Sequence, residues 1–399
     1  MSSVPGAGEG KLRIQVRVEK GVIAAVALAS TRPVSACSVL VGRRLDEALA
    51  LLPRLFSLCG VAQAVAGLRA VENALGLATP PPQAAARRLL VTAEALEQTV
   101  WRILIDGPRC IGVEPALEAL KSLRRVLASL RPLLFPDPVW MRIGGARLTP
   151  ARARLNAALD QIEHSVSQAV LGRTPTEGSP WRDRDAFETW IRTSPALAAL
   201  IPRWVNEQGL AGFGRGAVEP LPETDPAWLA RRLAHDADYS FCARPDHAGA
   251  VGETSALARC WTHPLIAALR TEHGNGLFVR LTARLVECAA LVAELRDQAR
   301  TVSDEHPDTP GLENTSGSGL GIVECARGRL VHWLAVAEGR VSAYRILAPT
   351  EWNFHPEGPL ARGLIDAPVG QGARVRQAIE LLVMALDPCV GFDLAVAEH

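Results

Sequence analysis

The sequence predicts a mainly α-helical fold with small β-sheets. Apolar and polar residues alternate over 12–18, which is the period of a half-buried strand. From residue 45 onward, apolar residues recur at spacings of three and four, which is the period of an amphipathic helix. Runs typical of strands return at 329–337 and 341–347, before a last helical stretch. The order is therefore a strand pair, many helices, a second strand pair and a final helix.

The N-terminal region predicts a β-hairpin at about 10–30. Leu12 opens the alternating run, and Glu19-Lys20-Gly21 provides a turn into a second apolar strand at 22–29. We expect this hairpin to form a small part of one domain that spans 1–399, because no internal repeat is visible.

Helical spacing begins after Gly42, leads toward Cys59, and is interrupted by the prolines at 80–82. Glycine and proline then predict breaks at 172–181 and 206–227. The residues at 301–319 are mostly polar or glycine, so we expect a loop or mobile segment there. The helices predicted after residue 80 cover 83–105, 113–131, 149–171, 276–300 (long and amphipathic) and 371–386.

Composition excludes several classes of protein. The 43 basic and 42 acidic residues nearly cancel, so nothing suggests a nucleic-acid partner. No apolar run reaches the length of a membrane span, and the first residues lack a signal-peptide pattern. We therefore expect a cytoplasmic protein. Its eight cysteines are scattered, which is typical of reduced core thiols rather than a disulfide framework.

Two of these cysteines lie in recognisable motifs near opposite ends of the chain. Cys59 is followed by Gly60, and Cys389 follows Asp387-Pro388. These segments resemble the two cysteine motifs of nickel–iron hydrogenase large subunits, R-x-C-G-x-C and D-P-C-x-x-C-x-x-H. Each motif keeps its first cysteine here and loses its second, because Ala62 and Phe392 occupy the second positions.

The resemblance extends along nearly the whole chain, in the family's order. Segment 9–14 resembles the family's E-G-H-L-R-I, and 253–259 resembles E-V-G-P-L-A-R. Segment 324–328 resembles E-A-P-R-G, and 349–353 resembles P-T-x-W-N. The resemblance implies a nickel–iron hydrogenase large-subunit-like fold. Because the chain is short and lacks two thiols, it is most similar to the hydrogenase expression/formation family HupK, also called HoxV, whose members help to assemble large subunits.

The family's nickel–iron site uses four thiolates, as the resemblance implies, and the two bridging ones are missing here. Nickel in a sulfur site needs most of those soft ligands, so we expect no stable nickel–iron centre. Two thiolates still suffice for an iron that brings its own ligands, such as an Fe(CN)2CO unit. We therefore expect Cys59 and Cys389 to bind this unit transiently, although the family's cysteines at those positions bind nickel alone.

Other site residues are carried over from the same motifs. Arg327 stands where the family places an arginine over the diatomic ligands of iron, and a guanidinium suits cyanide nitrogens. The alternative is a surface arginine beside a glycine. Glu9 matches a glutamate near the family's metal sites, for which we expect at most a structural role. Cys37 falls near a glutamate of the family's magnesium site, and Ala395 takes the place of its last histidine, so we expect no magnesium.

The resemblance leads to a function hypothesis. Family precursors carry a C-terminal extension that is cleaved after nickel insertion, and we expect no such step here because the chain ends soon after Cys389. The leading hypothesis is a non-enzymatic scaffold that receives Fe(CN)2CO from HypC/HypD-type maturation proteins and passes it to the apo large subunit. One alternative is a metal-free large-subunit mimic that acts as a folding or interaction chaperone. Another is a redox enzyme with altered metal ligation.

Overall fold

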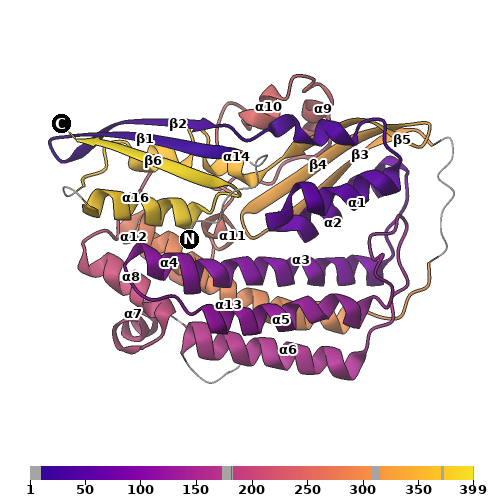
Figure 1. Cartoon of the computed structure of the whole chain (residues 1–399). Helices are drawn as coiled ribbons and strands as arrows, with labels where there is room; N and C mark the ends of the chain where they lie inside the picture. The colour runs from indigo at the N-terminus through magenta and orange to yellow at the C-terminus, as the bar shows by residue number, and fades with distance from the viewer. Residues whose placement is uncertain (1–9, 173–180, 182, 308–314, 370–372, 399) are drawn as a thin grey trace.

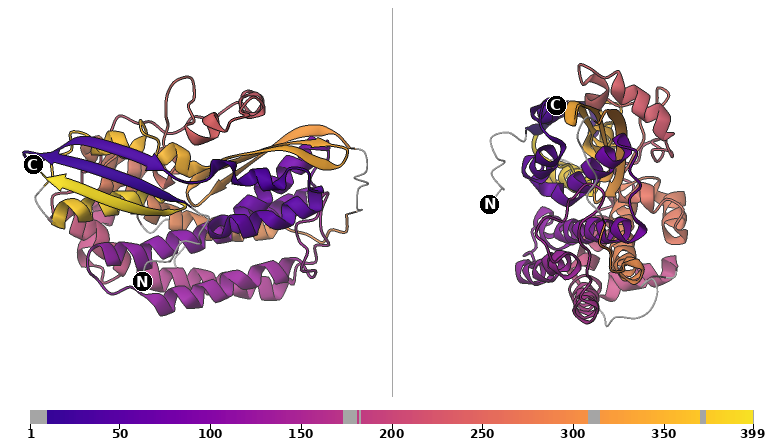
Figure 2. Two further views of the ribbon diagram at one scale, coloured as in Figure 1. Left: turned by 45° about the horizontal axis from the view of Figure 1, so that its top comes forward. Right: turned by 90° about the vertical axis from the view of Figure 1, so that its right-hand side faces the viewer.

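The computed structural model describes residues 10–172, 181, 183–307, 315–369 and 373–398. Two three-stranded sheets lie along one side of the molecule, and a layer of long helices lies beneath them (Figure 1). The turned views keep this arrangement, with α3, α5, α6 and α13 in the helical layer (Figure 2). Among the described residues, no single helix has the length and apolar composition of a membrane span. Two successive helices, Leu45–Leu55 and Ser57–Ala74, have this length and composition only when they are taken together, and they are bent by 99° relative to each other.

The first sheet has the strand order β2-β1-β6. The predicted hairpin is confirmed: β1 (Lys11–Glu19) pairs antiparallel with β2 (Val22–Ser30), and alternate residues of β1 are buried. Strand β6 (Gly391–Glu398) was missed, and it pairs parallel with β1. Leu12 is paired with Ser30 on one side and with Phe392 on the other. The end of β2 and the start of β6 therefore lie at the same end of this sheet.

The second sheet is an antiparallel meander of β3 (Gly317–Cys325), β4 (Gly328–Ala337) and β5 (Arg340–Leu347). The predictions of β4 and β5 are confirmed. The prediction of a loop through residue 319 is wrong at its end, because β3 already begins at Gly317. Its glycines obscure the strand pattern in the sequence. Residues 308–314 of that loop lie outside the described residues.

The predicted long helices are present with shifted ends, and several short helices at 184–273 were not predicted. Helix α13 is amphipathic only in its second half, because every residue from Leu277 to Cys288 is buried. The predicted break at 172–181 lies almost wholly outside the described residues. The α-helices are α1 (Leu45–Leu55), α2 (Gly60–Ala74), α3 (Pro81–Trp101), α4 (Gly107–Cys110), α5 (Leu117–Leu134), α6 (Arg152–Val166), α7 (Arg184–Thr193), α8 (Leu197–Glu207), α9 (Pro226–Ala234), α10 (Ser240–Ala243), α11 (Ala256–Arg259), α12 (Pro264–His273), α13 (Leu277–Thr301), α14 (Pro349–Asn353), α15 (Pro359–Leu364) and α16 (Ala373–Leu386).

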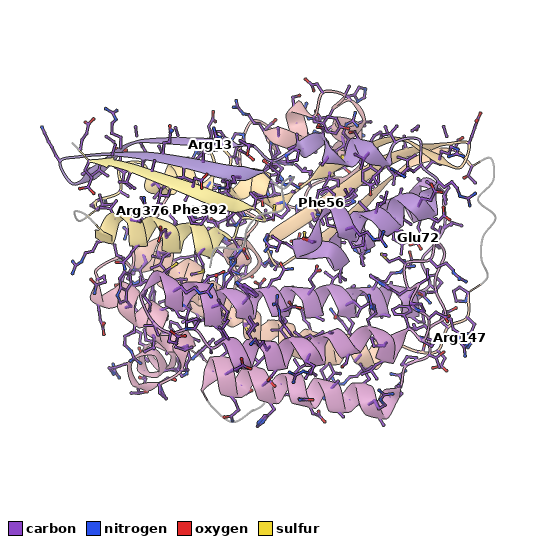
Figure 3. The ribbon with its side chains drawn as sticks, viewed as in Figure 1. Arg13, Phe56, Glu72, Arg147, Arg376 and Phe392 are labelled. Atoms are coloured by element: carbon purple, nitrogen blue, oxygen red, sulfur yellow. The ribbon has the colours of Figure 1, made fainter. Side chains whose placement is uncertain are left out.

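A buried ion pair joins α2 to the helical layer. Glu72 points from α2 toward α3 (Figure 3), where Arg87 Nη1 lies 2.7 Å from its carboxylate. Both side chains are only 1% exposed. Since an unpaired buried charge is costly, this pair ties the position of α2, and so of the segment that precedes it, to α3.

Glycines in β3 let α2 approach the second sheet very closely. A Cβ added at Gly317, Gly319 or Gly321 would collide with the carbonyl oxygens of Ala74, Ala70 and Ala66, respectively. The glycines alternate along the strand and the alanines are one helical turn apart, so the two periods match along this contact. Side chains at these positions would push α2, and with it the Cys59 segment, off the sheet.

We predict that Gly319→Ala destabilises the fold by about 1–3 kcal/mol or more, because the new methyl group would overlap backbone atoms of α2. Ser318→Ala is the matched control, since Ser318 is exposed on the opposite face of the same strand. Urea unfolding of both variants measures the difference. Equal unfolding midpoints for the two variants would contradict this account of the contact.

Candidate functional site: a pocket of thiols and arginines

A pocket of about 60 Å³ lies where the ends of the two sheets meet the start of α2. About 10–15 Å³ on this measure holds one water, so the pocket has room for a group several atoms in size. Leu55, Phe56, Leu330, Pro349 and Val390 contribute apolar walls. The polar lining includes Arg32, Cys59, Gln63, Cys325, Arg327 and Cys389.

The two motif cysteines both line this pocket. Cys59 ends the 3-10 turn Ser57–Cys59 just before α2, and it is 8% exposed. Cys389 follows α16, and its backbone N–H donates to Thr350 Oγ1 at 3.1 Å. The positions of the missing thiols do not line it: Ala62 is buried within α2, and Phe392 belongs to β6.

A third thiol, Cys325, also lines the pocket, and the sequence analysis missed it as a site residue. Cys325 ends β3 and is 5% exposed. It lies two residues before Arg327, at the alanine position of the E-A-P-R-G motif. That departure from the motif was the signal that could have identified it.

The thiols of Cys59 and Cys325 are protonated at neutral pH in the metal-free pocket. Burial raises the pKa of Cys59 well above its ordinary value, and the neighbouring Cys325 raises it further, although Arg327 opposes this. Burial also raises the pKa of Cys325 to about 11, again opposed by Arg327. A metal bound by these thiols therefore has to displace protons.

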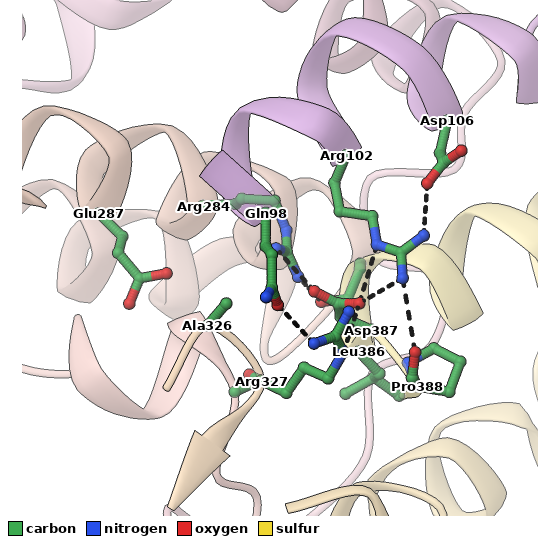
Figure 4. A network of polar contacts seen from close by, with 12 residues as sticks. Gln98, Arg102, Asp106, Arg284, Glu287, Ala326, Arg327, Leu386, Asp387 and Pro388 are labelled. Atoms are coloured by element: carbon green, nitrogen blue, oxygen red, sulfur yellow. Dashed lines mark hydrogen bonds and ion pairs between the residues drawn. The ribbon is translucent and has the colours of Figure 1, made fainter. Parts of the chain in front are cut away.

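Arg327 is buried in the pocket wall, so the alternative of a surface arginine is wrong. It is 3% exposed, and its Nη1 donates to Gln98 Oε1. Its Nε is 3.3 Å from Asp387 Oδ1 but has no aligned hydrogen bond. Figure 4 shows this contact as part of a network that converges on Asp387.

Asp387 collects three arginines from three elements. Arg102, from the π-helical turn Arg102–Asp106 after α3, places Nη2 2.6 Å from Oδ1. Arg284 of α13 places Nη1 3.4 Å from Oδ2. Burial alone would raise the pKa of Asp387, but Arg102, Arg327 and Arg284 lower it far below its ordinary value. The carboxylate therefore stays charged and fixes both Arg327 and the start of the Cys389 segment.

We predict that Asp387→Asn destabilises the protein by about 3 kcal/mol or more, because the buried Arg284 and Arg327 and the partly exposed Arg102 would lose their common anion. Asp297→Asn is the control, since Asp297 and its partner Arg300 are each 71% exposed. It should leave stability almost unchanged. Thermal unfolding followed by circular dichroism compares the two variants, and a similar midpoint in both would refute the role of Asp387.

A chain of buried polar side chains supports Cys59. Gln63 Nε2 donates to Cys59 Sγ at 3.4 Å, and Gln63 Oε1 accepts from His332 Nε2 at 2.8 Å. The other ring nitrogen of His332 then accepts from the Tyr344 hydroxyl at 2.8 Å. This arrangement requires neutral histidine. Burial, with a smaller contribution from Arg32, lowers the pKa of His332 to about 3.

His332 therefore makes stability depend on pH. Its contribution is complete above the unfolded pKa of 6.5 and is lost as the pH falls toward 3, because the unfolded chain binds the proton first. We predict that His332→Gln is less stable than the wild type at neutral pH. When the pH is lowered from about 7.5 to about 5, however, the free energy of unfolding of the variant should fall by about 2 kcal/mol less than that of the wild type. Urea unfolding at both pH values measures this, and parallel losses would contradict it.

Glu94 of α3 is a further residue that the sequence analysis missed. Its carboxylate accepts from the backbone N–H groups of Val61 and Ala62, at 2.8 and 2.9 Å. Burial raises the pKa of Glu94 to about 7, although these two hydrogen bonds oppose the shift. Glu94 satisfies orphan donors at the start of α2 and so positions the backbone beside Cys59.

No group of three or more His, Cys, Asp or Glu side chains in the described part of the chain is arranged to hold a metal ion. Cys37 does not line the pocket. It is buried, with Sγ 3.4 Å from the Tyr344 carbonyl oxygen, and burial raises its pKa to about 11. Ala395 lies in β6, paired with Gln15. Glu9 and His399 lie outside the described residues.

The family model of nickel-dependent hydrogenases matches residues 217–393. The chain is 32% identical over 393 residues to the hydrogenase expression/formation protein HupK of Rhizobium leguminosarum bv. viciae, covering 98% of each chain. It is 34% identical over 395 residues to the hydrogenase expression/formation protein HoxV of Cupriavidus necator, covering 93% of each.

Solved structures confirm the predicted fold class. The Ni-Fe-Se hydrogenase of D. vulgaris Hildenborough matches with a TM-score of 0.68 at 18% identity, covering 93% of this chain and 94% of that one. The Ni-Fe-Se hydrogenase of Desulfomicrobium baculatum matches with a TM-score of 0.68 at 17% identity, covering 94% and 95%. The chain thus has the fold of a hydrogenase large subunit, and by its full-length relatives it belongs to the HupK/HoxV family of hydrogenase expression/formation proteins.

Proposed function

We propose that this protein acts in nickel–iron hydrogenase maturation as an assembly scaffold. It transiently carries an Fe(CN)2CO unit and delivers it to the apo large subunit. The observation that carries this proposal is that Cys59 and Cys389, which are far apart in the sequence, line one pocket together with Arg327.

The ligand set of the pocket favours a cargo that brings its own ligands. A bare metal ion would need three or more protein donors, and no such group is arranged among the described residues. An Fe(CN)2CO unit already has three strong ligands, so two thiolates can complete a weak attachment. Weak attachment suits a carrier, because the cargo has to leave.

The absence of bridging thiols argues against a resident nickel–iron centre. Ala62 and Phe392 offer no electron pair to a metal, and neither lines the pocket. Nickel would therefore lack the soft ligands that give it affinity and geometry in sulfur sites. We accordingly propose a role without catalytic turnover.

The proposed partners follow from the relatives and the fold. The full-length relatives are named hydrogenase expression/formation proteins, and the fold is that of the hydrogenase large subunit. We propose that HypC/HypD-type maturation proteins recognise this large-subunit-like fold and deliver the unit to it. The apo large subunit then receives the unit.

The test is to purify the protein, without oxygen, from cells that contain the hydrogenase maturation proteins. We expect iron together with infrared bands of cyanide and carbonyl. A Cys59→Ala/Cys389→Ala double variant should lose at least about nine-tenths of both, since a metal needs its ligand thiolates. Cys242→Ala is the matched control, because it removes a buried thiol that does not line the pocket.

Two results would overturn the carrier function. One is wild-type protein whose iron shows no cyanide or carbonyl bands. The other is an equal iron content in the double variant and the Cys242→Ala control. Either result, with the partner interaction retained, would favour the metal-free chaperone.

A further inference from the structure

The pocket contains a second buried arginine, Arg32, that no sequence motif indicated. Arg32 follows β2 by two residues, and Cys389 precedes β6 by two residues. Since Leu12 pairs with both Ser30 and Phe392, these two segments leave the first sheet at the same end. The topology of the sheet therefore places Arg32 beside Cys389.

The side chain of Arg32 is held in the pocket wall by an ion pair. Its Nη1 donates to Glu351 Oε1 at 2.9 Å, and the two side chains are 7% and 5% exposed. Burial alone would lower the pKa of Arg32, but the thiolate form of Cys389, the Glu351 carboxylate and the thiolate form of Cys59 raise it. Burial would also lower the pKa of Arg327, but Asp387 and then the thiolate forms of Cys59 and Cys389 raise it. Two fixed guanidinium groups thus share one small pocket with the thiols.

We propose that Arg32 and Arg327 form a two-cation site that binds the two cyanide groups of the cargo, one cyanide to each guanidinium. This inference rests on the proposed function and adds a residue that determines specificity. A cyanide bound to iron keeps negative charge on its nitrogen, so it accepts a charge-assisted hydrogen bond. A carbonyl ligand is a poor acceptor and suits the apolar walls of the pocket.

Neutralising Arg32 alone would leave Glu351 buried without its partner, so the test includes a double variant. Arg32→Met/Glu351→Gln removes both charges of the pair and protects the fold from an unpaired buried carboxylate. Glu351→Gln by itself keeps the guanidinium. Arg13→Met is the control for losing an arginine, because Arg13 is exposed on β1.

The first arm of the test uses protein loaded in cells that contain the maturation proteins. In Arg32→Met/Glu351→Gln we expect one cyanide band to shift while the carbonyl band moves less. We also expect the ratio of iron to protein to fall by about tenfold, which is the effect of losing one charge-assisted hydrogen bond. Glu351→Gln and Arg13→Met should keep both cyanide bands. Unchanged bands and iron in the double variant would overturn the role of Arg32.

The second arm uses the metal-free protein and thiocyanate, a linear anion with a nitrogen terminus. Thiocyanate should slow the alkylation of Cys389 by iodoacetamide, measured by peptide mass mapping against chloride at equal ionic strength. The protection should require about tenfold more thiocyanate in Arg32→Met/Glu351→Gln, and the same concentration in Arg13→Met.

The two arms separate failure of the inference from failure of the proposed function. If wild-type protein carries no cyanide or carbonyl bands, the carrier function fails, and thiocyanate protection that depends on Arg32 still supports a two-cation anion site. If thiocyanate protects the wild type and the double variant equally, or protects neither, the two-cation site is refuted whatever the iron content.

Discussion

The site depends on the ion pairs that the buried carboxylate of Asp387 makes with three arginines. This carboxylate binds Arg102 from the turn after α3, Arg284 from α13 and Arg327 from the β3–β4 connection. Arg284 and Arg327 are buried, so each would be a costly unpaired charge without this anion, whereas Arg102 is partly exposed and also pairs with Asp106. Since Cys389 follows two residues later, the network that fixes Arg327 also fixes one end of the thiol pair.

The pocket differs from the resembled motifs in the positions of its thiols and of its charged side chains. Two positions that hold bridging thiols in the resembled motifs are Ala62 and Phe392 here, while Cys325 adds a thiol at a motif position occupied by alanine. Arg32 and Arg327 add two cations to the same small space. This combination of thiols and cations is the basis of our proposal that the pocket binds an anionic group with its own ligands.

Backbone contacts bring these parts together. The parallel pairing of β1 with β6 places the C-terminal segment beside the start of the chain, and so brings Arg32 near Cys389. The glycines of β3 let α2 lie directly on the second sheet, which sets the position of Cys59. The buried hydrogen-bonded side chains of Gln63, His332 and Tyr344 then orient the thiol of Cys59.

The sequence by itself determined the mainly helical fold class, the hairpin, β4, β5 and the long helices, because hydrophobic periodicity is a local property. Its motifs also identified Cys59, Cys389 and Arg327. Only the tertiary structure decided that these residues line one pocket with Cys325 and Arg32. No local signal placed Arg32 there, since its position follows from the pairing of strands at opposite ends of the chain. Strand β3 escaped prediction because the glycines that admit a packed helix obscure its strand pattern. Strand β6 was missed although Phe392, Leu394 and Val396 alternate with exposed residues.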